Sequence, residues 1–397
     1  MGRAELDQEF ERIFGKKSEN RTFCPYRVSP LGAHVDHQRG IVTGLAIDKG
    51  IEIRYCSRED DLCELVSVNF EGMKRFSMSE LSQEKAGDWA DHLRGVAVVL
   101  RKKFPLPFGI QAVMAGDLPS GGISSSAAVI IAFMEALCRV NGIVLSDQGM
   151  ITLAREVENT YVGVQCGILD QSCEVLCRKG KLLYLDTGSQ EYELLAYPKE
   201  GREFGIGIFF SGLERSLANS KYNLRVDECK SAAYALEAYA EMDYGTYEST
   251  CLRDVPETVY REYGERLPAV WKKRADHYFS EMERVQAGAS AWKKGDLDTF
   301  GRLMFESGRS SIDNYECGCP ELIYMYEILA DTEGIYGARF SGAGFKGCCV
   351  ALFDSARKEQ IAKQVEERYL ARFPELSGAY AFYSCESADG IGKGDMK

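Results

Sequence analysis

The sequence predicts an α+β protein, and three observations support this class. Strand-like stretches and amphipathic helical segments are mixed in the first 200 residues, longer helical segments follow from about residue 210, and strands return near the end. Mixed elements of this kind pack as layers of helices on sheets. A chain of 397 residues can also bury a large core, and we expect two domains, at residues 1–200 and 201–397.

The first half is expected to begin with a helix and to continue with strands and helices. Leu6, Phe10, Ile13 and Phe14 recur at helical spacing, so a short amphipathic helix is expected over 4–15. Runs rich in apolar residues predict strands, and runs of good helix formers predict helices. In chain order, the further expected elements are strands at 41–47, 50–56 and 63–70, a helix at 87–103, a strand at 109–115, helices at 127–137 and 146–163, and strands at 181–185 and 204–210.

The second half is expected to consist of long helices followed by a short mixed region. Helices are expected at 222–242, 268–294, 296–310 and 319–331. Strands at 335–341 and 347–353, a helix at 355–372 and a strand at 379–384 close the chain. No internal repeat or low-complexity linker marks the boundary between the halves.

Composition and charge exclude several classes of protein. The net charge of −12 argues against general nucleic-acid affinity, although a local cationic site would still accept an anionic substrate. The chain has no 18-residue apolar stretch and no apolar signal-peptide core, so we expect no membrane span and a cytoplasmic location. The 14 cysteines are therefore expected to be reduced, mostly buried thiols. Without a CxxC pair, a structural zinc site is not expected.

The segment 119–127, PSGGISSSA, is the most informative in the chain. Gly121, Gly122 and the serines Ser124, Ser125 and Ser126 precede an apolar helical run. Unpaired N–H groups and the helix dipole make a helix N-terminus attractive to anions. Glycines allow a phosphate to approach the backbone, and hydroxyls add donors and possible Mg²⁺ ligands. The segment therefore predicts a phosphate site, although an ordinary capped helix would show the same residues.

Three further segments carry more polar and glycine residues than folding needs. Residues 26–40 bring five ionisable side chains together in a turn-rich stretch. A carboxylate there could accept hydrogen bonds from sugar hydroxyls, or the stretch could simply be a solvated polar loop. These side chains are Arg27, His34, Asp36, His37 and Arg39. In the segment 156–171, Glu158 lies late on a helix and Asp170 begins the next helix. Asp170 could also do no more than cap that second helix. Residues 339–349 form a glycine-rich turn or a tight hairpin through Gly342 and Gly344.

Together, these segments resemble the galactokinase branch of the GHMP small-molecule kinases. Residues 26–40 resemble its sugar signature GRVNLIGEHTDYNxG, and 119–127 its ATP loop PxGxGLSSSA, here one residue shorter. Residues 156–171 are similar to ExxxxGxxCGIMDQ, and 339–349 to GxGFGGC with Lys346 in place of a glycine. Residues 216–225 resemble SLxxSxYxxR, and residues 303–322 resemble LMxESHxSL…CPEL. The matches span residues 24 to about 350 in the family's order.

The resemblance implies a fold, an activity and a set of site residues. The implied fold has a ribosomal-S5-like N-terminal domain and a ferredoxin-like C-terminal domain, with ATP and sugar meeting in the cleft between them. The implied protein is an ATP- and Mg²⁺-dependent sugar 1-kinase, a monomer or weak homodimer, without nucleic-acid or membrane partners. Asp170 matches the catalytic aspartate, and Arg27 the arginine beside it. Ser125 and Glu158 match Mg²⁺ ligands; Gly121, Gly122, Ser124, Ser125, Ser126, Gly342 and Gly344 match nucleotide contacts; His34, Asp36, Gly167 and Tyr222 match sugar contacts.

One departure from the sugar signature concerns the substrate. Ala33 stands where galactokinases carry the glutamate that touches the C6 hydroxyl. If C6 bore a carboxylate, that glutamate would cost roughly 4 kcal/mol at about 4 Å and an effective dielectric of about 20, or about three decades of affinity. His37 and Arg39 add polar or basic groups, and GAHVDHQ is similar to the galacturonokinase sub-branch. We therefore expect D-galacturonate, phosphorylated at O1, with galactose or another neutral hexose as the alternative.

Two other classes of protein fit the sequence less well than a sugar kinase. Non-catalytic sugar sensors of this family lose residues of the serine-rich loop, whereas this chain keeps Ser124–Ala128, Arg27 and Asp170. A kinase of mevalonate or homoserine is disfavoured by the sugar signature and by the segment around Tyr222. A Walker A loop and the HRD and DFG motifs of protein kinases are absent from the sequence.

Overall fold

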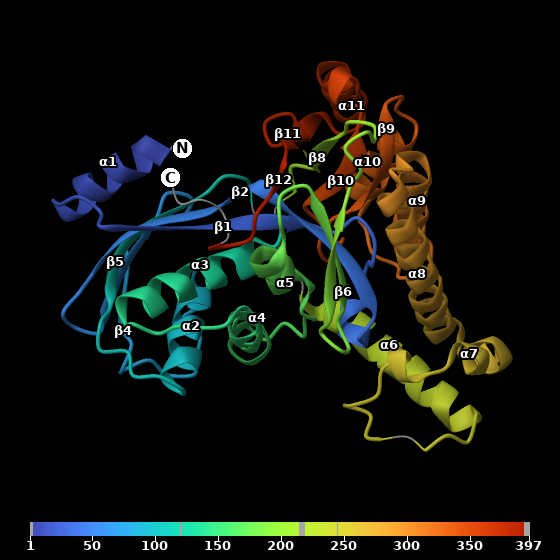
Figure 1. Ribbon diagram of the computed structural model, residues 1–397, viewed down its shortest axis with the longest axis horizontal. Helices are drawn as coiled ribbons and strands as arrows, with labels where there is room; N and C mark the ends of the chain where they lie inside the picture. The colour runs from blue at the N-terminus through green and yellow to red at the C-terminus, as the bar shows by residue number, and fades with distance from the viewer. Residues whose placement is uncertain (1–2, 120, 214–218, 244, 393–397) are drawn as a thin grey trace.

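Two β-sheets, one in each half of the chain, organise the protein in a computed structural model that describes residues 3–119, 121–213, 219–243 and 245–392 (Figure 1). The first sheet has the strand order β4-β3-β5-β2-β6-β7, and β1 and β12 also pair with β2. Its strands are β1 (Asn20–Val28), β2 (Ile41–Ser57), β3 (Leu62–Ser67), β4 (Lys74–Ser77), β5 (Ile110–Gly116), β6 (Lys181–Asp186), β7 (Tyr192–Ala196) and β12 (Ser387–Ala388).

Helices cover both faces of the first sheet. Four lie together below it in Figure 1: α2 (Asp91–Arg101), α3 (Ser125–Val140), α4 (Asp147–Glu156) and α5 (Leu169–Leu176). On the opposite face, α1 (Arg3–Phe14) buries Leu6 and Phe10 against Cys56, Val113 and Ala115. A π-helical turn, Val157–Val162, continues α4 toward the loop before α5. The first turns of α3 and α5 contribute Ser125 and Asp170 to the cavity described below.

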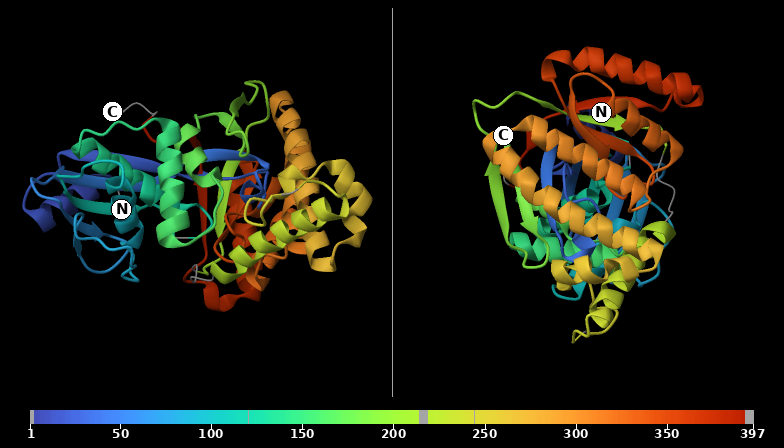
Figure 2. Two further views of the ribbon diagram at one scale, coloured as in Figure 1. Left: turned by 90° about the horizontal axis from the view of Figure 1, so that it is seen from below. Right: turned by 90° about the vertical axis from the view of Figure 1, so that its right-hand side faces the viewer.

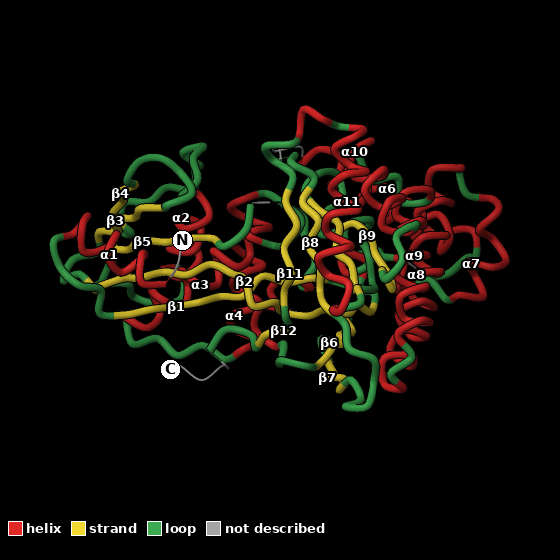
Figure 3. The backbone as a smooth tube through the Cα atoms, turned by 90° about the horizontal axis from the view of Figure 1, so that it is seen from above, coloured by secondary structure: helices red, strands yellow, loops and turns green. Residues whose placement is uncertain are grey.

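The second sheet is antiparallel and has the order β11-β8-β10-β9. Its strands are β8 (Gly205–Phe210), β9 (Ile335–Phe340), β10 (Cys348–Phe353) and β11 (Ala381–Cys385). The helices of this half are α6 (Asn219–Tyr239), α7 (Glu257–Tyr263), α8 (Ala269–Lys294), α9 (Leu297–Asp313), α10 (Pro320–Ala330) and α11 (Lys358–Arg372). Figure 2 shows α8 and α9 running side by side, and Figure 3 shows the second sheet between the first sheet and these helices. One buried apolar cluster joins residues of both sheets.

The predicted α+β class and most of the predicted elements are confirmed. The expected strands 41–47 and 50–56 form one strand, β2, because β1 pairs with it as far as Tyr55 and β12 pairs with it at Ile47. β1, β4, β7, β12 and α7 were not expected. β1 contains Pro25, which discourages a strand assignment, and the pairing register shifts at this point. The division at residue 200 stays a prediction, although β12 returns to the first sheet.

The cysteines and helices bear on two further expectations. All 14 cysteines lie in the described part of the chain and are free thiols, and 12 of them are buried, as expected. Among the described residues, no helix combines the length and the apolar composition that crossing a membrane requires. Ser120 of the glycine–serine loop and residues 216–218 of the segment 216–225 lie outside the described residues.

Candidate active site

A cavity of about 1070 Å³ is lined by residues of both halves of the chain. Its walls come from the end of β1 and the loop after it, the loops before α2 and α3, the region from Glu158 to Asp170, and the turn after β9. The predicted site residues on its wall are Arg27, Ala33, His34, Asp36, Gly121, Gly122, Ser124, Ser125, Ser126, Glu158, Gly167, Asp170, Tyr222 and Gly342. Segments far apart in the sequence therefore meet at one place.

Arg27 and Asp170 form an ion pair on this wall. The Arg27 Nε lies 2.7 Å from Asp170 Oδ1, and Nη1 donates to the Gly122 carbonyl at 2.9 Å. Arg27 is buried; burial alone would lower its pKa, but the Asp170 carboxylate outweighs this and keeps the pKa above its usual value. The guanidinium therefore stays charged, orients the carboxylate at the first turn of α5, and connects it to the glycine–serine loop.

Asp36 and Gly167 are in direct contact. A Cβ added to Gly167 would lie 2.2 Å from Asp36 Oδ2, so a side chain at this position would displace the carboxylate. Burial, and then the negative charge of Asp170, raise the pKa of Asp36 to about 6. The glycine thus has a steric role in placing a second carboxylate on the cavity wall.

His34 and His37 are held by Tyr315, which the sequence did not indicate. The His34 ring stacks on Tyr315 with centroids 4.0 Å apart and planes 4° apart. His37 Nε2 lies 3.1 Å from the Tyr315 hydroxyl, and its ring meets Tyr222 edge-on at 5.9 Å. Burial, and then His277, lower the pKa of His34 well below its usual range and that of His37 to about 3. Both rings are therefore neutral near pH 7.

Three predicted residues do not line the cavity: His37, Arg39 and Gly344. Arg39, expected near the substrate, instead donates to the Ser249 carbonyl at 3.0 Å and to Asp254 at 3.4 Å. Its side chain is 48% exposed, because the left-handed backbone at Arg39 turns it outward. Gly344 packs against Cys317, whose Sγ a Cβ would approach to 2.9 Å. These positions support the site from behind or lie outside it.

The two glycine-rich loops pack against each other through their backbones. Gly122 has a φ of +84°, and a Cβ there would lie 2.9 Å from the Ser341 carbonyl oxygen. A Cβ on Gly342 would lie 2.9 Å from the Gly122 Cα, and one on Gly347 would lie 2.7 Å from the Gly121 carbonyl carbon. The glycines are thus required for the contact between the loops, a reason that the sequence alone did not suggest. Lys346 is exposed and also lines the cavity.

Glu158 is buried next to the N-terminus of α3. Ser126 Oγ donates to Glu158 Oε1 at 2.9 Å, and Gln171 Nε2 donates to Oε2 at 2.5 Å. Cys166 Sγ also lies 3.2 Å from Oε2. Ser125, the first residue of α3, lines the same wall. A carboxylate and a hydroxyl therefore lie together at the positively polarised end of a helix.

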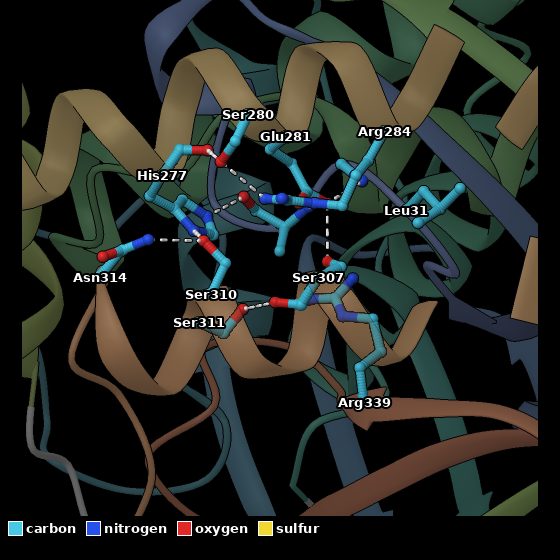
Figure 4. Close-up of polar contacts among 12 residues, drawn as sticks. Leu31, His277, Ser280, Glu281, Arg284, Ser307, Ser310, Ser311, Asn314 and Arg339 are labelled. Atoms are coloured by element: carbon cyan, nitrogen blue, oxygen red, sulfur yellow. Dashed lines mark hydrogen bonds and ion pairs between the residues drawn. The ribbon is translucent and has the colours of Figure 1, made fainter. Parts of the chain in front are cut away.

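A buried carboxylate on α8, Glu281, anchors the sugar-signature loop (Figure 4). Its Oε1 accepts the backbone N–H groups of Gly32 and Ala33 at 2.8 and 3.0 Å and the Ser307 hydroxyl at 2.7 Å. Oε2 pairs with Arg284 Nε at 2.7 Å. Nothing in the sequence pointed to Glu281, since it is one acidic residue among several on a long helix. Arg339, also drawn in Figure 4, could have been noticed because it is the first residue of the segment 339–349.

Comparison with known proteins agrees with this arrangement. The model for the N-terminal domain of GHMP kinases matches residues 91–178, and the model for their C-terminal domain matches residues 289–371. A galacturonokinase of Arabidopsis thaliana is 40% identical over 391 residues, covering 92% of this chain and 91% of that protein. A galactokinase of Clostridium perfringens is 34% identical over 369 residues, covering 92% of this chain and 93% of that protein.

A solved structure gives the same result for the fold. The crystal structure of Lactococcus lactis galactokinase complexed with galactose superposes with a TM-score of 0.89 at 28% identity, covering 98% of this chain and 99% of that chain. The predicted two-domain fold is therefore confirmed, and the family models match segments on either side of the cavity. The chain belongs to the GHMP kinases and is a sugar kinase of the galactokinase and galacturonokinase type.

Proposed function

We propose that this kinase transfers the γ-phosphoryl group of ATP to the anomeric hydroxyl of D-galacturonate, giving α-D-galacturonate 1-phosphate and ADP. The observation that carries the proposal is Ala33 on the wall of the cavity that also holds the Arg27–Asp170 pair. Galactose phosphorylation is the alternative, which the relatives named galactokinase favour. The relative named galacturonokinase supports the uronate.

The proposed chemistry begins at Asp170. Its carboxylate accepts the proton of the sugar O1 hydroxyl while the bond from O1 to the γ-phosphorus forms. The bond from that phosphorus to the bridging oxygen of ADP breaks at the same time. Arg27, whose Nε is 2.7 Å from Asp170 Oδ1, orients the carboxylate and lies where negative charge accumulates. Phosphoryl transfer needs mainly this alignment and compensation of charge.

The nucleotide is proposed to lie along the rest of the cavity. The N-terminus of α3, with Ser124, Ser125 and Ser126, faces the phosphates. Ser125 and Glu158 supply a hydroxyl and a carboxylate, hard oxygen donors that fit Mg²⁺ completed by phosphate oxygens and water. When bound, Mg²⁺ would neutralise phosphate charge. Phe70 and Trp89, stacked with centroids 6.3 Å apart on another part of the wall, offer apolar faces for the adenine.

A substrate panel with ATP tests the proposal. We expect kcat/KM for D-galacturonate to exceed that for galactose, measured as ADP released. Asp170→Asn is the control, and a loss of about 10³-fold or more with its fold intact would assign the activity to this site. A higher kcat/KM for galactose would replace the proposed substrate by the alternative. ADP formation that is absent with every sugar, in a folded protein, would instead favour a non-catalytic sugar sensor.

A further inference from the structure

We propose that Arg339 is the specificity-determining residue that binds the C6 carboxylate of the uronic acid. This inference rests on the proposed function, since it concerns how the same cavity recognises a charged substrate. Arg339 lies at the end of β9, next to the second glycine-rich loop, and lines the cavity together with Ala33 and His34.

The hydrogen-bonding state of Arg339 leaves donors available. The residue is 2% exposed, and its Nη1 donates to the Ser29 carbonyl at 2.7 Å, which fixes the guanidinium beneath the sugar-signature loop. Its Nε has no hydrogen-bond partner among the described residues. No carboxylate of the described chain lies within ion-pair distance of this guanidinium. A buried guanidinium in this state is costly, and a carboxylate that binds side-on would remove the cost.

Glu281 is the protein carboxylate that interacts electrostatically with Arg339, but both of its oxygens already have partners. Its two oxygens accept the Gly32 and Ala33 N–H groups, the Ser307 hydroxyl and the Arg284 Nε. Glu281 therefore attracts Arg339 through space without a direct bond, and Figure 4 shows Arg339 reaching toward this cluster from below. Position 33 is an alanine, so it brings no acidic side chain to the guanidinium.

Other cations on the cavity wall are less suited to this role. Arg27 is paired with Asp170, Lys85 donates to the Val162 carbonyl, and Lys346 is exposed. His34 is stacked on Tyr315 and uncharged near pH 7 because burial lowers its pKa. Arg39, the candidate suggested by the sequence, is outside the cavity. Arg339 thus combines charge, burial and a free donor on the cavity wall that Ala33 also lines.

The test compares charged and neutral forms of the same sugar. D-Galacturonamide keeps the ring and a planar C6 group but carries no charge, and galactose serves as the third substrate. In Arg339→Gln we expect kcat/KM for galacturonate to fall by about 30-fold or more beyond any fall for galacturonamide, mainly through KM. Arg339→Lys keeps the charge but loses the two-pronged geometry of the guanidinium. Its kcat/KM for galacturonate should therefore lie between the values for the wild type and for Arg339→Gln.

An equal loss for all three sugars would show that Arg339 only supports the loop through Ser29, and would overturn the inference. No loss for galacturonate would place the carboxylate elsewhere and would also overturn it. A wild-type enzyme that prefers galactose would instead contradict the proposed function itself, so the two failures are distinguishable.

A second measurement covers the case in which Arg339→Gln does not fold. Ala33→Glu adds a carboxylate beside Arg339, and Ala33→Gln is its uncharged match. Without sugar, we expect the glutamate variant to unfold at a higher temperature than the glutamine variant, because it pairs with the guanidinium. An equal or lower unfolding temperature would mean that Arg339 is out of reach of groups at position 33, and would refute the inference.

Discussion

Removing the charge of Glu281 is expected to destabilise the protein and to loosen the sugar-signature loop. Glu281 is fully buried, and Glu281→Gln keeps its shape while leaving Arg284 without its ion-pair partner. Breaking a buried pair of this kind costs about 3–5 kcal/mol. The amide oxygen could still accept from Gly32, Ala33 and Ser307, but an amide N–H₂ would then replace Oε2 and face the Arg284 Nε.

The pKa of Glu281 gives the magnitude independently. Burial opposes ionisation, but Arg284, and then His277 and Arg339, outweigh it and lower the pKa from 4.5 to about 2. At about 1.4 kcal/mol per pH unit, this corresponds to about 3 kcal/mol of stability. Because the folded-state pKa is the lower one, this stability is present above pH 4.5 and is lost as the pH falls toward 2. The cost of breaking a buried ion pair and the pKa shift of Glu281 therefore give a similar contribution to the free energy of unfolding.

Urea unfolding at pH 7 and pH 3 measures this contribution. We expect Glu281→Gln to lower the free energy of unfolding by about 3 kcal/mol at pH 7, and the difference from wild type to shrink by about half at pH 3. Ser307→Ala, which removes one hydrogen bond, is the matched control and should cost about 1 kcal/mol. A Glu281→Gln loss below about 1 kcal/mol at pH 7, or a loss independent of pH, would refute the reasoning.

Three further perturbations address the site itself. Ala33→Glu should reduce kcat/KM for galacturonate about 1000-fold relative to galactose in steady-state kinetics. A similar reduction in Ala33→Gln would exclude charge as the cause. Gly167→Ala should raise KM for the sugar more than about tenfold, since its Cβ would lie 2.2 Å from Asp36 Oδ2; an unchanged KM would contradict this steric role. Glu158→Gln should raise the Mg²⁺ concentration needed for half-maximal activity about 10- to 100-fold, and an unshifted Mg²⁺ titration would argue against its role as a ligand.

The sequence by itself determined the class of the protein and indicated most of the residues that the structure brings to the wall of one cavity. Residue types and their order in four segments were enough to indicate Arg27, Asp170, Glu158 and the serine-rich helix start, because each motif lies on one short piece of backbone. Local patterns also predicted most helices and strands. The pattern failed at β1, where Pro25 interrupts the strand pattern, and at β2, where pairing with neighbours joins two expected strands.

Only the tertiary structure decided that Arg339, and not Arg39, lines the cavity. Arg39 and Arg339 are both arginines beside recognised motifs, and sequence reasoning chose the first. A left-handed turn directs Arg39 to Asp254 at the surface, whereas β9 carries Arg339 beneath the loop that holds Ser29 and Ala33. The contact of Glu281 with that loop, across 249 residues, is likewise a product of packing. A direction in space depends on the fold around a residue, so no local pattern could have supplied it.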